Sequence, residues 1–143
     1  MGVLTKLVIA DAADAGRVQE SDDLSADFRS IDVRGIDPVK LCRLRSVLLA
    51  TPYDNSWIKG FATLAGTPED GHWTFSVPPD LVDALTEVAP DQLSDIAQKW
   101  HASEEFRLDR WSLVDVAATL QRIYTLCSES QSQGRSVLMW MSL

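Results

Sequence analysis

Residues 137–141 read Val-Leu-Met-Trp-Met, an unbroken apolar run near the end of the sequence. Side chains along a β-strand point alternately to its two faces, so a strand that is apolar at every position must be covered on both sides. The even positions, Leu138 and Trp140, would lie on one face and the odd positions on the other. We therefore expect this segment to form a buried strand that fixes the end of the chain in the core.

Several earlier segments contribute to the predicted sheet and its turns. Residues 3–9 (VLTKLVI) are β-branched and apolar, and residues 73–77 (WTFSV) alternate between apolar and polar side chains, as strands do. Residues 28–33 (FRSIDV) alternate more weakly. Residues 57–64 (WIKGFATL) fit either a strand or a short helix, and residues 66–71 (GTPEDG) indicate a turn.

Four helices are predicted from their start signals and from the spacing of their apolar residues. Asp37 can accept a hydrogen bond from the first N–H groups of a helix, and Pro38 suits the first helical position. Ser112, with Asp115 three residues later, resembles a capping box before the longest apolar stripe. The helices begin at Asp37-Pro38, Pro78-Pro79, Pro90 and Ser112, and Pro52 and Gly134 end the first and the last.

These segments predict a single α+β domain over residues 1–143. Apolar residues make up 45% of the chain and charged residues 24%, as in ordinary globular domains. We expect a small mixed or antiparallel sheet of about three to five short strands, packed with about three or four helices. Residues 11–27 and 101–111 are expected to connect these elements, the first with one helical turn around residues 13–19.

The charge balance excludes some classes of partner. The chain has 21 acidic and 13 basic residues and a net charge of −8, whereas nucleic acids and anionic membranes attract an excess of Lys and Arg. The acids are concentrated in residues 80–115, which hold nine acids and three bases. We therefore predict no nucleic acid or membrane partner and expect a basic protein to be attracted instead.

Two cysteines and the N-terminal residues indicate the cellular compartment. Cys42 and Cys127 lie in apolar helical patterns, and neither belongs to a Cys-x-x-Cys pair. We expect two buried free thiols, as is typical of the reducing cytoplasm. The apolar run at residues 3–9 is too short to span a membrane and is followed closely by Asp11, so we expect neither a signal peptide nor a transmembrane helix.

Two groups of side chains are candidates for metal or ligand binding. His101 and Glu104 are three positions apart, so one helix would place both on the same face, and His72 is the only other histidine. Two ligands do not complete a metal site, so the sequence predicts no bound metal or cofactor. Four aspartates could gather a hard cation if the chain brought them together: Asp11, Asp14, Asp22 and Asp23.

Catalytic motifs are missing from the sequence, whereas tryptophan is abundant. There is no Gly-x-Ser-x-Gly nucleophile elbow and no Gly-rich phosphate-binding loop, so the sequence favours a protein that is not an enzyme. Two of the five tryptophans stand beside polar residues, which is typical of tryptophans in binding surfaces. The predicted binding surface consists of Trp57, Trp111, Glu104, Glu105 and Asp109.

Three segments together resemble a known family. They are IDVRGIDPVKLCRLRSVLLA at residues 31–50, WTFSVPPDLVDAL at residues 73–85 and GRSVLMWMSL at residues 134–143. In their order they resemble the YfbM-like family of small bacterial proteins, over about two-thirds of the chain by layout. The aspartate-rich residues 11–27 fall outside the resemblance. That family has no established activity, so the resemblance implies a fold and supplies no catalytic residues.

The sequence leaves open two functions from different classes. The first is a bacterial interaction protein that binds a basic protein partner, of which a toxin-neutralising (immunity-type) protein is one version. The second is a small-ligand-binding protein or enzyme with a pocket near His101 and Glu104. A homodimer is compatible with both.

Overall fold

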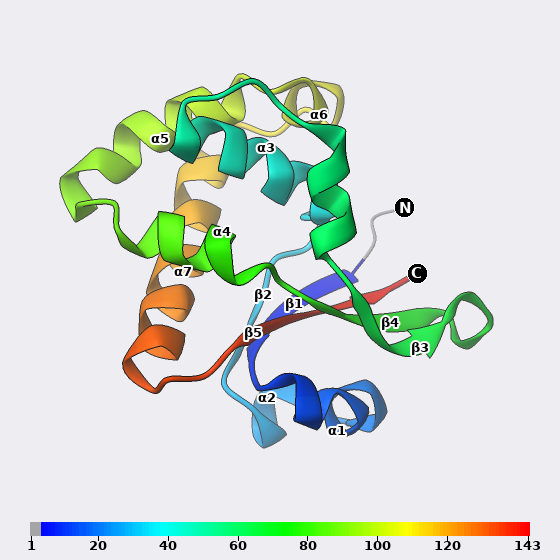
Figure 1. The fold of residues 1–143 in the computed structure, drawn as a ribbon. Coiled ribbons are helices and arrows are strands. Elements are labelled where there is room, and N and C mark those ends of the chain that lie inside the picture. The colour runs from blue at the N-terminus through cyan, green and yellow to red at the C-terminus, as the bar shows by residue number, and fades with distance from the viewer. Residues whose placement is uncertain (1–3) are drawn as a thin grey trace.

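The computed structural model describes residues 4–143 and contains one open sheet of five strands (Figure 1). The strand order is β2-β1-β5-β4-β3, and every neighbouring pair is antiparallel. The predicted α+β class is therefore confirmed, and of the two expected sheet types the antiparallel one is found. The strands are β1 (Leu4–Ile9), β2 (Ser30–Asp32), β3 (Thr63–Thr67), β4 (His72–Ser76) and β5 (Val137–Ser142).

The last strand, β5, occupies the centre of the sheet. It pairs with β1 from Ile9 opposite Val137 to Leu4 opposite Ser142, and it pairs with β4 on its other side. Leu138 is 1% exposed on one face, and Val137 is 2% exposed on the other. The expectation of a strand that is buried on both faces is therefore confirmed.

Seven α-helices accompany the sheet within the described residues. The four predicted helices are present as α3, α4, α5 and α7, and the predicted helical turn near residues 13–19 corresponds to α1. Two very short helices, α2 and α6, were not expected, and α6 lies inside the segment that was predicted to be a connection. The helices are α1 (Ala15–Glu20), α2 (Leu24–Asp27), α3 (Pro38–Leu49), α4 (Pro79–Thr86), α5 (Leu93–His101), α6 (Glu104–Leu108) and α7 (Leu113–Ser132).

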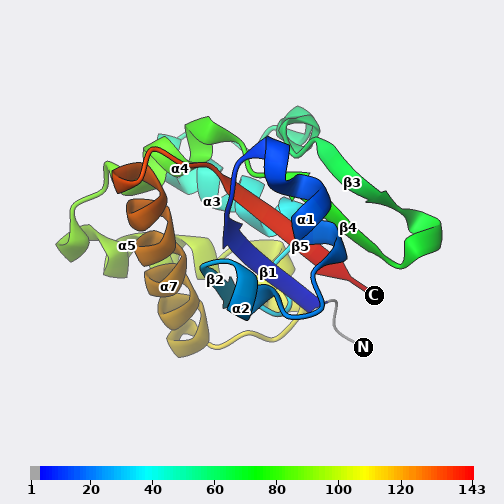
Figure 2. The same ribbon diagram turned by 90° about the horizontal axis from the view of Figure 1, so that it is seen from below.

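The helices form two unequal layers on the sheet (Figures 1 and 2). The short α1 and α2 cover one face, where Val18 and Leu24 pack with Leu138 in a small apolar cluster. The longer α3, α4, α5 and α7 lie on the opposite face and enclose the main core. Within residues 4–143, no helix is both long enough and apolar enough to cross a membrane.

The ambiguous segment at residues 57–64 is divided between two elements. Its first part belongs to a 3₁₀ helix, Asn55–Gly60, which begins where the Asp54 side chain accepts a hydrogen bond from the Ser56 N–H. Its second part enters β3, which is joined to β4 by a tight turn that contains the 3₁₀ helix Pro68–Asp70. The turn predicted from Gly66 to Gly71 is therefore present but begins after the last residue of β3.

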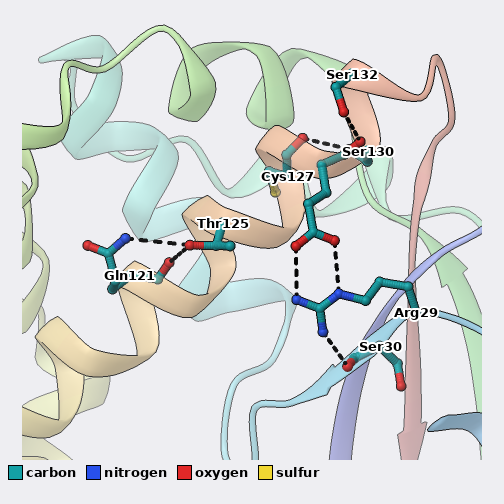
Figure 3. A network of polar contacts seen from close by, with 8 residues as sticks. Arg29, Ser30, Gln121, Thr125, Cys127, Ser130 and Ser132 are labelled. Carbon is teal, nitrogen blue, oxygen red and sulfur yellow. Dashed lines mark hydrogen bonds and ion pairs between the residues drawn. The ribbon is translucent and has the colours of Figure 1, made fainter.

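An ion pair joins the entry of β2 to α7 (Figure 3). The Arg29 Nε atom donates to Glu129 Oε2 at 2.9 Å, and Nη2 donates to Oε1 at 3.1 Å. These bonds hold the pKa of Glu129 below its ordinary value of 4.5, with burial acting in the opposite direction. Because both side chains are more than one-third exposed, solvent screens the pair and limits its contribution.

We expect a double-mutant cycle of Arg29→Ala and Glu129→Ala to give a coupling free energy of about 0.5–1 kcal/mol at pH 7. Because the pKa of Glu129 is lowered by folding, this stabilisation is complete above pH 4.5 and is lost as the pH falls through the lowered value. Urea denaturation of the four proteins at pH 7 and at about pH 3 measures both effects. A coupling energy that is unchanged at acidic pH would contradict the expectation.

Candidate functional site

The predicted pair of His101 and Glu104 is divided between two helices. His101 is the last residue of α5 and Glu104 is the first residue of α6, so they do not share one helical face. The His101 Nε2 atom lies 2.8 Å from the carbonyl oxygen of Trp111, and since that oxygen can only accept, Nε2 must carry the proton. Nε2 therefore has no lone pair for a metal. Among residues 4–143, no group of three or more His, Cys, Asp or Glu side chains is arranged to hold a metal ion.

Three of the four aspartates proposed as cation ligands bind other groups of the chain. Arg135 contacts Asp11 at 3.8 Å and Asp14 at 3.1 Å. Asp23 accepts a hydrogen bond from the Ala26 N–H and so caps α2. The expectation that all four could gather a cation is therefore wrong, because two of the carboxylates bind a guanidinium and a third binds backbone.

Two acids of the predicted binding surface are neutralised by bases of the same chain. Arg43 donates to both carboxylate oxygens of Glu105, at 2.6 and 3.3 Å, and this bond raises the pKa of Arg43. Lys40 donates to Asp109 at 2.5 Å. Glu105 and Asp109 therefore offer little free negative charge to a partner, and of the three predicted acids only Glu104 is without an ion pair in the described part of the chain.

Lys40 is a buried cation, with a side chain that is only 3% exposed. Its Nζ also donates to the Gly35 carbonyl oxygen at 2.6 Å. The ring centres of Phe106 and Trp111 lie 5.6 and 5.8 Å from Nζ. A buried ammonium is tolerated only when hydrogen bonds and an opposite charge replace its water, and Asp109 with the Gly35 carbonyl supplies them. Lys40 thus ties α3 to the segment that follows α6.

The two tryptophans of the predicted surface are half-buried rather than free. Trp57 packs under the guanidinium of Arg45, whose central carbon is 4.9 Å from the ring centre. Trp111 packs against Phe106, with ring centres 5.0 Å apart. Gly35 has a φ of +86°, and a Cβ at this position would lie 3.1 Å from a carbon of the Trp111 ring. Only glycine therefore allows the chain to approach Trp111 so closely.

One hollow, of about 450 Å³, is lined by acidic and aromatic side chains, and we call it the acidic hollow. Its acids are Glu20, Asp22 and Asp70, and the rings of His72 and Trp140 line it as well. In the described part of the chain none of these three carboxylates forms an ion pair, and no lysine or arginine lines the hollow.

Hydrogen bonds hold the wall of the acidic hollow in place. The Gln19 Nε2 atom lies 2.6 Å from His72 Nδ1 and donates to the His72 carbonyl oxygen at 3.0 Å. The Gln19 Oε1 atom accepts from the Thr74 hydroxyl at 2.8 Å. Because the Gln19 amide nitrogen can only donate, His72 Nδ1 must accept, and the neutral ring carries its proton on Nε2. Helix α1 is thereby fixed to β4 directly beside the acids.

Two further hollows adjoin at Arg110, and we call them the arginine hollows. The first, of about 570 Å³, is also lined by Arg34, which follows β2, and by Arg122 of α7. The second, of about 500 Å³, is also lined by Arg107 and His101. Arg110 and the tryptophan that follows it line both.

The residues of these hollows could not be found from local sequence patterns. The arginines of the first hollow come from positions 34, 110 and 122, and the acids of the acidic hollow come from positions 20, 22 and 70. Each set is assembled by the sheet and helix packing, and neither forms a spaced motif. The single local signal is the pair Arg107 and Arg110, which stands among acids in residues 80–115.

The resemblance to the YfbM-like family stays a prediction that the fold neither supports nor opposes. In comparisons with known proteins, no family model, no curated sequence and no solved structure matches this chain.

Proposed function

We propose that this protein is a non-enzymatic interaction module that binds a basic protein partner in the bacterial cytoplasm. The observation that carries the proposal is the acidic hollow, in which Glu20, Asp22 and Asp70 are free of ion pairs within the described residues. A lysine or arginine side chain of a partner would gain three nearby carboxylates there. It would also gain a cation–π contact with Trp140, since an indole face attracts cations.

The net charge and the cysteines support the same function. A charge of −8 steers a basic partner toward the protein before contact is made. Cys42 and Cys127 are free and buried, and burial raises the pKa of Cys127 to about 12. A nucleophilic cysteine requires a lowered pKa, so Cys127 is suited to packing and not to catalysis. An immunity-type protein that neutralises a basic toxin is one version of this proposal.

The proposed docking position differs from the surface expected from the sequence. Glu105 and Asp109 are neutralised by Arg43 and Lys40, so they would attract a partner only weakly. Helix α1 ends at Glu20, which lines the acidic hollow, and this helix lies on the face of the sheet opposite α3 (Figures 1 and 2). The acids of the hollow form no ion pair among the described residues. A basic partner would therefore dock at the acidic hollow and not at the surface around Glu105 and Asp109.

We expect the double variant Glu20→Gln, Asp22→Asn to bind a short oligo-arginine peptide roughly tenfold more weakly than the wild type, because two exposed charges each contribute up to about 1 kcal/mol. Association should slow at low salt and differ little at high salt, where such charges are screened. Stopped-flow kinetics with a fluorescent peptide at low and high salt measures both the affinity and the association rate.

The matched control is Glu87→Gln, Asp91→Asn, which removes the same charges from exposed positions outside the acidic hollow. It should change the affinity for the peptide much less. If both double variants weaken binding equally, the peptide responds to net charge alone, and the proposed docking site is wrong.

A second candidate function is the binding of a small ligand near His101. The observation that favours it is the second arginine hollow, whose volume of about 500 Å³ lies within the range of small-molecule sites. His101 lines this hollow, whereas Glu104 does not.

A further inference from the structure

Five lysines and arginines of this protein form no ion pair among the described residues. The sequence has 13 lysines and arginines against 21 acids, so most bases should find a carboxylate. Eight of the 13 do so within the described residues. The five that do not are Lys59, Arg34, Arg107, Arg110 and Arg122. All four of these arginines line the arginine hollows.

The acids that line the first arginine hollow are largely offset by other bases. Lys6 contacts Asp32 at 2.7 Å, and Lys40 contacts Asp109 at 2.5 Å. Asp115 is the only lining acid without an ion pair among the described residues. Three arginines therefore face one uncompensated carboxylate, and the local charge is positive in a protein that is negative as a whole.

The second arginine hollow is lined by no acid at all within the described residues. It contains Arg107 and Arg110, together with Ser112, which caps the 20-residue helix α7. The start of a helix carries a partial positive charge from its aligned peptide dipoles, and this adds to the field of the two guanidinium groups.

Arg110 has a backbone conformation that glycine would adopt more easily. Its φ is +59°, in the left-handed region. The Arg110 N–H bonds to the Arg107 carbonyl at 3.2 Å, and the Trp111 N–H bonds to the Phe106 carbonyl at 3.0 Å. This pattern is the Schellman motif that ends many helices, in which the left-handed residue is usually glycine. Arg110 therefore stands at a strained backbone position, and its side chain lines both hollows.

We infer that the two arginine hollows form one site for a small molecule that carries phosphate or carboxylate groups, with Arg110 as the central contact. This inference rests on the second candidate function, small-ligand binding beside His101. Guanidinium groups form paired, charge-assisted hydrogen bonds with both kinds of oxyanion. The volumes of about 570 and 500 Å³ give room for the rest of such a molecule beside Trp111.

The test is a titration of the ¹⁵N-labelled protein with inorganic phosphate and, separately, with citrate at constant ionic strength. The indole N–H signal of Trp111, assigned with Trp111→Phe, should shift in a saturable way with at least one of them. Arg110→Gln should weaken that binding roughly tenfold or more, because it removes charge-assisted hydrogen bonds. Lys59→Gln is the matched control, because Lys59 is the unpaired base that lines neither hollow, and it should leave the affinity unchanged.

A second pair of variants separates binding from folding. Arg110→Gly should raise Tm by roughly 1–4 °C, because glycine relieves the strain at positive φ, and yet it should abolish the saturable shift. Ala50→Gly relieves the same strain at a φ of +51°, outside both hollows, and should raise Tm with no loss of binding.

The inference fails if neither anion binds saturably, or if Arg110→Gln and Lys59→Gln bind with the same affinity. It also fails if a neutral or cationic metabolite from the host occupies the hollows with an affinity that does not depend on Arg110. In that last case small-ligand binding beside His101 would stand without the anion chemistry. The inference of an anion site can therefore fail while the second candidate function, small-ligand binding beside His101, still holds.

Discussion

Deletion of residues 137–143 is expected to abolish cooperative folding. The deletion removes β5 from the centre of the sheet, so β1 and β4 lose their common neighbour and the sheet falls into two pairs of strands. Isolated strand pairs are marginal in water. The deletion also removes Leu138 and Met139, which are 1% and 0% exposed, and each large buried side chain contributes about 2–5 kcal/mol. Their sum is comparable to the whole stability of a domain of this size, about 5–15 kcal/mol.

Circular dichroism and urea denaturation measure this outcome, with deletion of Leu143 alone as the control. Leu143 is 78% exposed and lies outside β5, so its loss should leave the unfolding transition close to that of the wild type. A sigmoidal, cooperative unfolding curve for the chain that lacks residues 137–143 would show that the other four strands form a stable sheet without β5. The central role assigned to β5 would then be wrong.

The features that the sequence predicts correctly are those whose causes are local. The apolar run at residues 137–141 requires cover on both faces, and the structure provides it. Asp37 accepts a hydrogen bond from the Lys40 N–H at 2.8 Å, and Ser112 accepts from the Asp115 N–H at 3.1 Å. These caps act within four residues, so they can be recognised without knowledge of the fold.

Short helices were missed because they are too short to show a periodic pattern. Helix α6 has five residues and buries only Phe106, so no stripe at helical spacing can be seen in the sequence. Its existence has a large effect on the candidate site, because α6 begins at Glu104, after α5 has ended at His101, and Arg110 follows its C-terminal cap, Asp109. The candidate pair assumed one helix through His101 and Glu104, whereas the chain breaks between the two residues.

The polar partnerships could not be predicted, because they join residues that are far apart in sequence. Lys40 and Asp109 are separated by 69 positions, and Arg43 and Glu105 by 62. From sequence alone the acids of residues 80–115 were expected to face solvent and a partner. In the folded chain three of them (Asp80, Glu105 and Asp109) pair with bases on α3, whereas the acidic hollow and the arginine hollows gather charges from distant parts of the sequence.

Trp100→Ala is expected to lower the free energy of unfolding by about 3–5 kcal/mol, as large-to-small substitutions of buried aromatic residues do. Trp100 is 0% exposed and packs edge-to-face on Phe106, with ring centres 4.8 Å apart. Its indole N–H donates to the Lys40 carbonyl oxygen at 2.8 Å, and this hydrogen bond would be lost. Urea denaturation followed by circular dichroism gives the change from the shift in midpoint at constant m-value.

Trp100→Phe separates the two causes, because it keeps most of the ring and removes the N–H. We expect it to destabilise less than Trp100→Ala, with a loss of about 1–3 kcal/mol that includes the lost hydrogen bond to the Lys40 carbonyl. The half-buried Trp57 is the matched comparison, since Trp57→Ala removes an equal side chain that solvent already reaches. If Trp100→Ala and Trp57→Ala destabilise equally, Trp100 does not hold α3, α5 and α6 together. The positions of Lys40 and of Arg110 beyond α6 would then need another support.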